Sequence, residues 1–438
     1  MIRSAPGEVA RGRAFLMKIG FDIPCETRTL ENGLTVVVAP QPGLPVVTVD
    51  VTYDVGSRVE PEGKTGFAHL FEHLMFEGSE NVGKGEHFRL VADAGGMMNG
   101  TTSEDRTNYF ETVPAEWLDL ALFLEADRMR ALVLTQEKLD NQREAVKEEK
   151  RLRVDNQPYA SSFETADAIA YESFPYRHPV IGSMDDLDRA TLDDARGFYE
   201  RYYAPGNALL CVAGDVAPDD AFARAARAFA GVPARETPPP FSVTEPEPRE
   251  ERRARVLDPH AALPALHVNV KAPPRRDPDS LALLYAEKIL GGGESGTLWR
   301  KLVKDEEKAL SLSVHMDERR GPSLFRVFAI ARPLVPLDLL EREIRAALRH
   351  LAEDGPAPEE LERARRMLAA DMVRSTQTTQ AVAFLLSEYG LYDGDPHAWR
   401  DDFTRILSVD AAGVRDAARR AFSPARISVV EVVPSGAP

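Results

Sequence analysis

A proline-rich stretch near the middle of the chain limits what this sequence can fold into. Residues 233–249 read PARETPPPFSVTEPEPR, with many prolines and few large apolar side chains. Because proline lacks a backbone donor and favours extended structure, the sequence predicts an exposed linker over 233–250. The chain has 438 residues, too many for one ordinary domain, so we expect two domains, over 22–232 and 251–436.

The two predicted domains repeat the same order of elements. Each begins with apolar segments of period two, continues with a helix, and ends in a helix, a proline-containing turn and a strand. The segments that carry this order are 34–39, 46–51, 191–216, 256–257, 266–270, 280–292 and 408–433. We therefore expect an α+β fold of two similar domains, each an antiparallel sheet with helices packed on one face. The alternative is that α+β domains often show such an order without duplication.

Charge and hydropathy exclude several classes of function. The net charge of −16 argues against nucleic acid and anionic membrane as main partners. No apolar run approaches the roughly 18 residues of a membrane span, so we expect none. The first residues contain Arg and Lys and only a short apolar patch, which Lys18 interrupts, unlike a secretory signal. We expect a cytoplasmic protein, although a misassigned start would leave the periplasm open.

Residues 69–73 read His-Leu-Phe-Glu-His and place two imidazoles and a carboxylate within five residues. On a helix, positions i, i+3 and i+4 share one face, so His69 and His73 could bind one metal ion with Glu72 beside it. Burying three such groups on an apolar helix would be costly without a metal or hydrogen-bond partners. The spacing H-x-x-E-H occurs in zinc proteases. It predicts a site in which Glu72 takes the proton of a zinc-bound water.

A catalytic zinc ion usually has three protein ligands, so the third must come from elsewhere in the chain. The only cysteines, Cys25 and Cys211, give no suitable ligand, which leaves a carboxylate. A predicted helix over 137–153 has an apolar face on which Glu149 is the only acid, whereas Glu144 and Glu148 project towards water. The residues of that face are Leu139, Gln142, Ala145, Val146, Glu149 and Leu152. The alternative is a structural Glu149 that is capped or paired with an arginine.

Four longer blocks give the chain a family resemblance: 56–79, 95–114, 141–152 and 198–216. Together they resemble the M16 family of zinc peptidases, which includes pitrilysin, insulin-degrading enzyme and mitochondrial processing peptidase. The length and the two-part layout are most similar to the bacterial short-chain branch. The resemblance is strong up to about residue 216 and weak after the linker. It implies a zinc metalloendopeptidase, with one Zn²⁺ per chain, that acts on peptides or unfolded segments.

Carried over by position, the resemblance implies roles for seven residues. Three of them, His69, His73 and Glu149, would bind zinc, and Glu72 would be the general base.

Asn99 and Gly100 match the family's Asn-Ala pair, on an edge strand that binds the substrate backbone by strand addition. Here Gly replaces Ala, which leaves the main-chain donors intact. The alternative for this segment is a glycine-rich hairpin without a ligand. Gln142 stands where family members carry a glutamate, and it could still hydrogen-bond behind the metal ligands, without charge.

The second half departs from the family pattern. Members that cleave unaided carry an Arg after a glycine-rich block and a Tyr in a later block, and both bind the substrate carbonyl. Here Thr297 stands where the Arg is expected, and Leu312 lies near the Tyr position. Losing one oxyanion donor typically costs about 10²–10³ in rate. We therefore expect a heterodimer in which a homologous M16 subunit supplies Arg and Tyr, with a homodimer as the second possibility.

The competing class of function is non-enzymatic: a zinc-binding scaffold or chaperone-like subunit that has lost catalysis. The missing Arg and Tyr favour it. The intact set of His69, Glu72, His73 and Glu149 opposes it, because a decayed site would be expected to lose one of the four.

Overall fold

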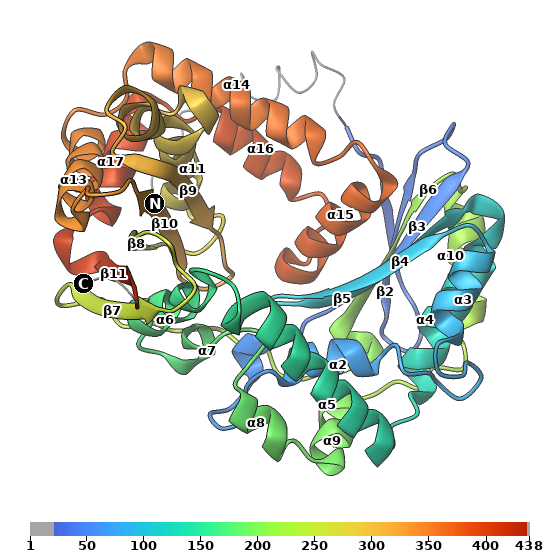
Figure 1. The fold of residues 1–438 in the computed structure, drawn as a ribbon. Coiled ribbons are helices and arrows are strands. Elements are labelled where there is room, and N and C mark those ends of the chain that lie inside the picture. Colours follow the sequence, from blue (N-terminus) through green and yellow to red (C-terminus); the bar gives the residue numbers. More distant parts are fainter. Residues whose placement is uncertain (1–21, 436–438) are drawn as a thin grey trace.

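The computed structural model describes residues 22–435, which form two β-sheets with helices packed around each (Figure 1). The first sheet has six strands in the order β1-β2-β6-β3-β5-β4. Its strands are β1 (Glu26–Thr29), β2 (Thr35–Pro40), β3 (Val46–Tyr53), β4 (Met97–Thr102), β5 (Thr107–Pro114) and β6 (Ala208–Gly214). Neighbours run antiparallel except β2 and β6, which run parallel. Strand β4 therefore lies at one edge of this sheet.

The second sheet has five strands in the order β7-β11-β8-β10-β9. Its strands are β7 (Arg252–Asp258), β8 (Ala265–Ala272), β9 (Ala309–Asp317), β10 (Ser323–Ala331) and β11 (Ile427–Pro434). Only β7 and β11 run parallel. The predicted α+β fold of two similar parts is confirmed, and one detail differs: each sheet is mixed, because its closing strand, β6 or β11, pairs in parallel with a strand from the start of the same part.

Two helices of the first part pack on one face of its sheet, and α2 (Phe67–Leu74) lies next to its β4 edge. Helices α4 (Leu118–Ala131) and α10 (Pro218–Phe229) pack on the face, while α2 contacts β4 and α5 (Gln136–Lys150). The remaining helices of this part are α3 (Glu86–Asp93), α6 (Ala160–Ala170), α7 (Phe174–Arg177), α8 (Met184–Arg189) and α9 (Leu192–Tyr202). The core under the sheet is a cluster of valines, leucines and aromatic rings that holds α2 by its apolar side.

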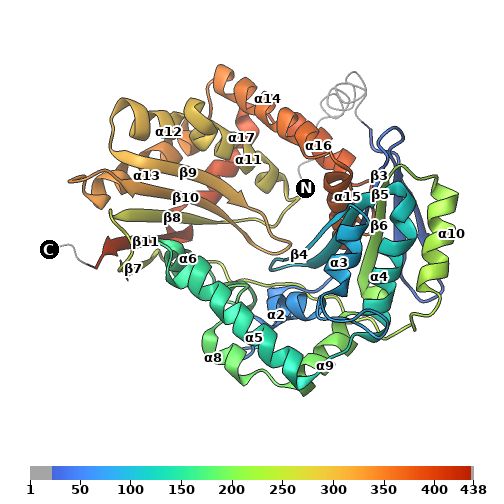
Figure 2. The same cartoon turned by 45° about the vertical axis from the view of Figure 1, so that its right-hand side comes forward.

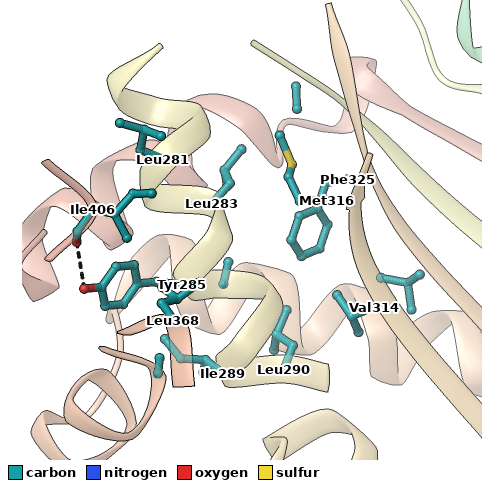
Figure 3. Close-up of a cluster of buried hydrophobic side chains, with 14 of the residues drawn as sticks. Leu281, Leu283, Tyr285, Ile289, Leu290, Val314, Met316, Phe325, Leu368 and Ile406 are labelled. Carbon is teal, nitrogen blue, oxygen red and sulfur yellow. Dashed lines mark hydrogen bonds between the residues drawn. The ribbon is translucent and has the colours of Figure 1, made fainter. Parts of the chain in front are cut away.

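The second part has its core around α11 (Pro278–Gly291), and the same cluster continues to β2 and β6 of the first sheet. Leu283 and Leu290 of α11 face Met316 and Val314 of β9, while Ile289 lies on the side of Leu368 (Figure 3). The Tyr285 hydroxyl in the same cluster donates a hydrogen bond to the carbonyl of Ile406 at 2.8 Å (Figure 3). The other helices are α12 (Thr297–Trp299), α13 (Leu337–Glu353), α14 (Pro358–Arg374), α15 (Thr379–Asp393), α16 (Trp399–Leu407) and α17 (Ala411–Ala421).

Each part contributes one helix to the sheet of the other. Helix α15 of the second part packs across β3 and β6, and α6 of the first part packs across β7, β8 and β11 (Figures 1 and 2). Both sheets are thus covered on two faces, one by their own helices and one by a helix from the other part. The sequence predicted helices on one face of each sheet, and this prediction accounts only for the layer formed by each part's own helices.

The predicted linker over 233–250 forms neither helix nor strand, and most of its residues are exposed. The boundaries drawn from the sequence, 22–232 and 251–436, stay predictions, and residue 436 lies outside the described residues, as do residues 1–21. Within residues 22–435, no helix combines the length and the apolar character needed to cross a bilayer.

Candidate metal centre

Helix α2 divides its side chains between the core and a polar site. Phe67, Leu70, Phe71 and Leu74 are buried in the cluster under the first sheet. The histidines and the glutamate of the motif occupy the remaining side of the same two turns, as the i, i+3, i+4 spacing predicts. Apolar packing on one side of this short helix therefore fixes where His69, Glu72 and His73 point.

Helix α5 brings Glu149 to both histidines. Its Oε2 atom lies 3.6 Å from His69 Nε2 and 3.3 Å from His73 Nε2. Because zinc binds nitrogen and oxygen at about 2.0–2.2 Å, two ligand atoms of one tetrahedral ion lie roughly 3–4 Å apart. The side chains are 13%, 25% and 17% exposed for His69, His73 and Glu149. The three residues therefore offer one ligand atom each, and these atoms lie within 4.8 Å of one another.

The protonation state of the first histidine also suits a metal. Burial, followed by the charge of the neighbouring His73, lowers the pKa of His69 to about 4, against the pull of Glu149. The imidazole is therefore neutral at pH 7, the form that donates a lone pair to a metal. Its buried Nδ1 has no hydrogen-bond partner among the described residues.

Gln142 lies behind the second histidine. Its Oε1 is 3.3 Å from His73 Nδ1, and its Nε2 donates to Glu77 Oε1 at 2.8 Å. Since the Gln142 oxygen can only accept, Nδ1 carries the proton and Nε2 is left free on the side of Glu149. An amide thus selects the tautomer that a metal ligand needs, without adding charge.

The predicted apolar face of α5 is narrower than its periodicity suggested. Leu139 and Val146 are buried and Glu149 is half-buried, but Ala145 and Leu152 are exposed. The prediction was wrong for these two; Leu152 lies beyond the end of α5, in a π-helical turn at Arg151–Asp155. Glu144 and Glu148 are exposed, as expected.

The alternative reading of Glu149, an arginine pair, is also present. Arg153, which follows in the π-helical turn, binds Glu149 Oε1 at 2.8 Å. The Arg153 side chain is 76% exposed, and Oε2 is the atom that faces the histidines. The two oxygens of Glu149 therefore have separate partners, and the exposed arginine does not compete for the inner one.

Glu72 lies beside the three-residue cluster and has a different environment. The hydroxyl of Thr102, on β4, donates to Glu72 Oε2. Burial raises the pKa of Glu72, and the Thr102 hydrogen bond opposes that rise. A carboxylate with a raised pKa and one fixed oxygen suits proton transfer, because the optimal pKa of a general base lies near the working pH.

Asn99 and Gly100 lie on β4, the edge strand next to α2. Asn99 is exposed and Gly100 is buried. A Cβ atom at position 100 would lie 3.0 Å from Glu72 Cγ and 3.2 Å from Phe76 Cε2, so the glycine is in close contact with the helix of the motif. Within the described residues, β4 pairs with β5 on one side only, and its other edge is open to an added strand.

Sequence reasoning missed a second buried cluster, formed by His87, Glu111 and Glu125. His87 Nε2 lies 2.9 Å from Glu111 Oε1, but Arg128 is in the same cluster and pairs with Glu125. The guanidinium already supplies a cation to both carboxylates, so these residues form an ion-pair network.

In the second part, the side chains of Thr297 and Leu312, which depart from the family pattern, make contacts within the second part. The Thr297 hydroxyl donates to the carbonyl of Ile289 at 3.1 Å, at the end of α11. Leu312 is buried in the core of the second part. Neither side chain offers a donor for a substrate carbonyl.

Two family models match successive parts of the chain. Residues 35–183 match insulinase (peptidase family M16), and residues 189–368 match the peptidase M16 inactive domain. The zinc protease PqqE of Helicobacter pylori is 32% identical over 413 residues, which cover 93% of this chain and 93% of that protein. The chain belongs to peptidase family M16.

Other M16 proteins show how far the likeness extends. A crystal structure of a protease from Helicobacter pylori superposes with a TM-score of 0.90 at 31% identity, over 94% of this chain and 100% of that one. A probable mitochondrial-processing peptidase subunit beta of Arabidopsis thaliana is 24% identical, over 93% of this chain and 78% of that protein. Both parts of the chain therefore have counterparts in this family, whose bacterial relatives are named zinc proteases.

Proposed function

We propose that this chain is the zinc-bearing subunit of an endopeptidase that hydrolyses peptides or unfolded segments. The observation that carries the proposal is the approach of Glu149 to both histidines, with Glu72 beside them. In this proposal His69, His73 and Glu149 hold one Zn²⁺ per chain, and Glu72 is the general base. The names of the M16 relatives support zinc as the metal.

The residues around the centre would divide the work of hydrolysis. When bound, zinc supplies Lewis-acid chemistry, which polarises the scissile carbonyl and lowers the pKa of water. Glu72 takes the proton from the attacking water and delivers it to the leaving amine. Thr102 fixes the Glu72 carboxylate, and the open edge of β4 at Asn99 and Gly100 binds the substrate backbone as an added strand.

We propose further that a homologous M16 subunit completes the site. Thr297 and Leu312 replace the expected Arg and Tyr, and both are engaged within the second part. The likeness to a mitochondrial-processing peptidase subunit beta supports an arrangement of unlike subunits. A homodimer is the second possibility.

The same two positions favour a second candidate function, a zinc-binding scaffold or chaperone-like subunit without catalysis. The match of residues 189–368 to an inactive domain fits a second part that supplies no catalytic group. The matched range does not include His69, Glu72, His73 or Glu149, so it says nothing against catalysis by the first part.

The experiment compares the chain alone with a mixture of the chain and a homologous M16 subunit that carries the Arg and Tyr, on quenched fluorescent peptides. Activity in the mixture that falls by about 10²–10⁴-fold in Glu72→Gln, and that a chelator removes and zinc restores, supports the peptidase. Full activity of the lone chain contradicts the shared site. Stoichiometric zinc without activity in either sample favours the scaffold.

A further inference from the structure

Glu60 is a fully buried carboxylate near the candidate metal centre that has no role in the proposed chemistry. It follows the short helix η1 (Ser57–Val59), and its side chain is 0% exposed. Its Oε2 accepts a hydrogen bond from the Gly66 amide at 2.8 Å, and its Oε1 accepts from the Ala68 amide at 2.6 Å. Both amides belong to the start of α2, so one side chain holds the first turn of the helix that carries the motif.

Helix α2 needs this external acceptor because it cannot provide its own. The first amides of any helix lack partners within the helix, and a Ser, Thr, Asp or Asn at the N-cap usually satisfies them. Here the N-cap is Gly66, with φ of +83° and no side-chain cap. A Cβ at Gly66 would lie 2.6 Å from the Ile181 carbonyl oxygen, so no residue with a capping side chain fits there.

The first turn matters because it contains His69. The helix begins at Phe67, so His69 is its third residue and directly follows Ala68, whose amide Glu60 binds. Helix ends fray unless their amides are satisfied. His73 and Glu72 lie one turn further on, where internal hydrogen bonds and the packing of Leu70, Phe71 and Leu74 hold the backbone. Of the motif residues, His69 therefore depends most on Glu60.

The chain before the helix is fixed separately. The Asp186 carboxylate accepts from the Thr65 amide at 3.0 Å and from the Thr65 hydroxyl at 2.6 Å. The ordering of Thr65 by Asp186 leaves the amides of the helix itself to Glu60. Burial raises the pKa of Glu60 to about 8, and the amides of α2 oppose that rise. Because a neutral carboxyl still has an acceptor, a decisive test removes the acceptor and not only the charge.

We propose that Glu60 is a positioning residue for the metal centre: by binding the amides of Gly66 and Ala68 it fixes the first turn of α2 and with it the ligand His69. This inference rests on the proposed zinc site. It assigns to Glu60 a contribution to metal affinity and ligand geometry, and no contact with substrate.

The test measures zinc affinity by competition with a chromophoric chelator, and the visible absorption of the cobalt(II)-loaded protein, in the purified wild type and four variants. Glu60→Met has a similar volume and no acceptor, and Glu60→Gln keeps one acceptor. Glu62→Gln is the matched control, because Glu62 is exposed and two residues away. Ser387→Ala is a control for general destabilisation, since it weakens a contact of α15 distant in the sequence from α2.

We expect Glu60→Met to weaken zinc binding by about 10–100-fold and to alter the cobalt bands, as loss of a residue that supports a ligand usually does. Glu60→Gln should have a smaller effect, and both controls should match the wild type. A folded Glu60→Met whose zinc affinity is within threefold of the wild type, with the wild-type cobalt spectrum, overturns the proposal. If Glu60→Met does not fold, Glu60→Gln decides by the same threefold limit. Failure of the wild-type chain to bind zinc at micromolar concentration would instead refute the proposed function.

Discussion

At the scale of single residues, the neighbouring carboxylates of Glu148 and Glu149 on α5 have different surroundings. Glu149 directs Oε2 to two imidazoles, whereas Glu148, one residue earlier, is exposed and binds Arg151 at 3.0 Å. The two glutamates share a helix, a charge and a local sequence. They differ in which side of α5 they occupy, and this makes them a matched pair for testing the metal site.

We expect Glu149→Gln to weaken zinc binding by more than about 100-fold, beyond the usual cost of changing a residue that only supports a ligand. The amide is a poorer ligand than a carboxylate and removes the negative charge that balances the ion. Glu148→Gln should bind zinc like the wild type. Competition with a chelator measures both, and equal affinity in the two variants would show that Glu149 is the arginine-paired structural residue instead.

The sequence predicted some residues of this neighbourhood for physical reasons and missed others. Helical spacing places His69, Glu72 and His73 on one side, and this needs no tertiary information. The approach of Glu149 could be inferred from periodicity, but the same periodicity wrongly included Ala145 and Leu152. Thr102 and Glu60 could not be found from the residues alone, because their partners lie 30 and 6 to 8 positions away and only tertiary packing brings them together.

At the scale of elements, α15 and α6 each pack on the sheet of the other part. This packing explains why polar residues alternate with valines in the central strands. Thr48, Asp50 and Thr52 of β3 are buried, although the alternation resembled a strand with one face in water. They face α15, where the Thr48 and Thr379 hydroxyls lie 2.8 Å apart. In the second sheet His267, Asn269 and Lys271 are buried in the same alternating way on the face towards α6. A polar interface between parts thus has the same sequence pattern as a solvent-facing surface.

We expect Ser387→Ala to lower the free energy of unfolding by about 1–3 kcal/mol, the usual cost of leaving a buried acceptor short of a partner. The Ser387 hydroxyl on α15 donates to Asp50 Oδ2 at 2.6 Å, in a fully buried position. Ser295→Ala, in an exposed turn, is the control and should change stability by less than about 0.5 kcal/mol. Urea denaturation followed by circular dichroism measures both, and equal midpoints would mean that α15 does not depend on this contact.

At the scale of the whole molecule, the two parts depend on each other, because each supplies the helix, α15 or α6, that covers one face of the other part's sheet. Cutting the chain in the linker would expose the face of β3 and β6 that α15 covers and the face of β8 and β11 that α6 covers. The β4 edge and the candidate metal centre belong to the first part, whose sheet α15 of the second part covers.

The contact between α6 and the second sheet should make stability depend on pH. Ser162 Oγ on α6 lies 2.7 Å from His267 Nε2 on β8, and burial, followed by the charge of Arg326, lowers the pKa of His267 to about 3. The unfolded chain has a histidine pKa of about 6.5 and so binds this proton more readily. Stability from the neutral imidazole is complete above pH 6.5 and is lost as pH falls towards 3, by about 1.4 kcal/mol per pH unit.

The prediction is tested with His267→Gln, which cannot take up this proton. Between pH 7.5 and pH 5 the difference in unfolding free energy between wild type and variant should move by about 2 kcal/mol in favour of the variant. Urea denaturation of the metal-free proteins at both pH values measures it. His315→Gln, on the exposed side of β9, should follow the wild type at both. An unchanged difference would mean that His267 keeps an ordinary pKa, and that the interface between α6 and the second sheet admits water.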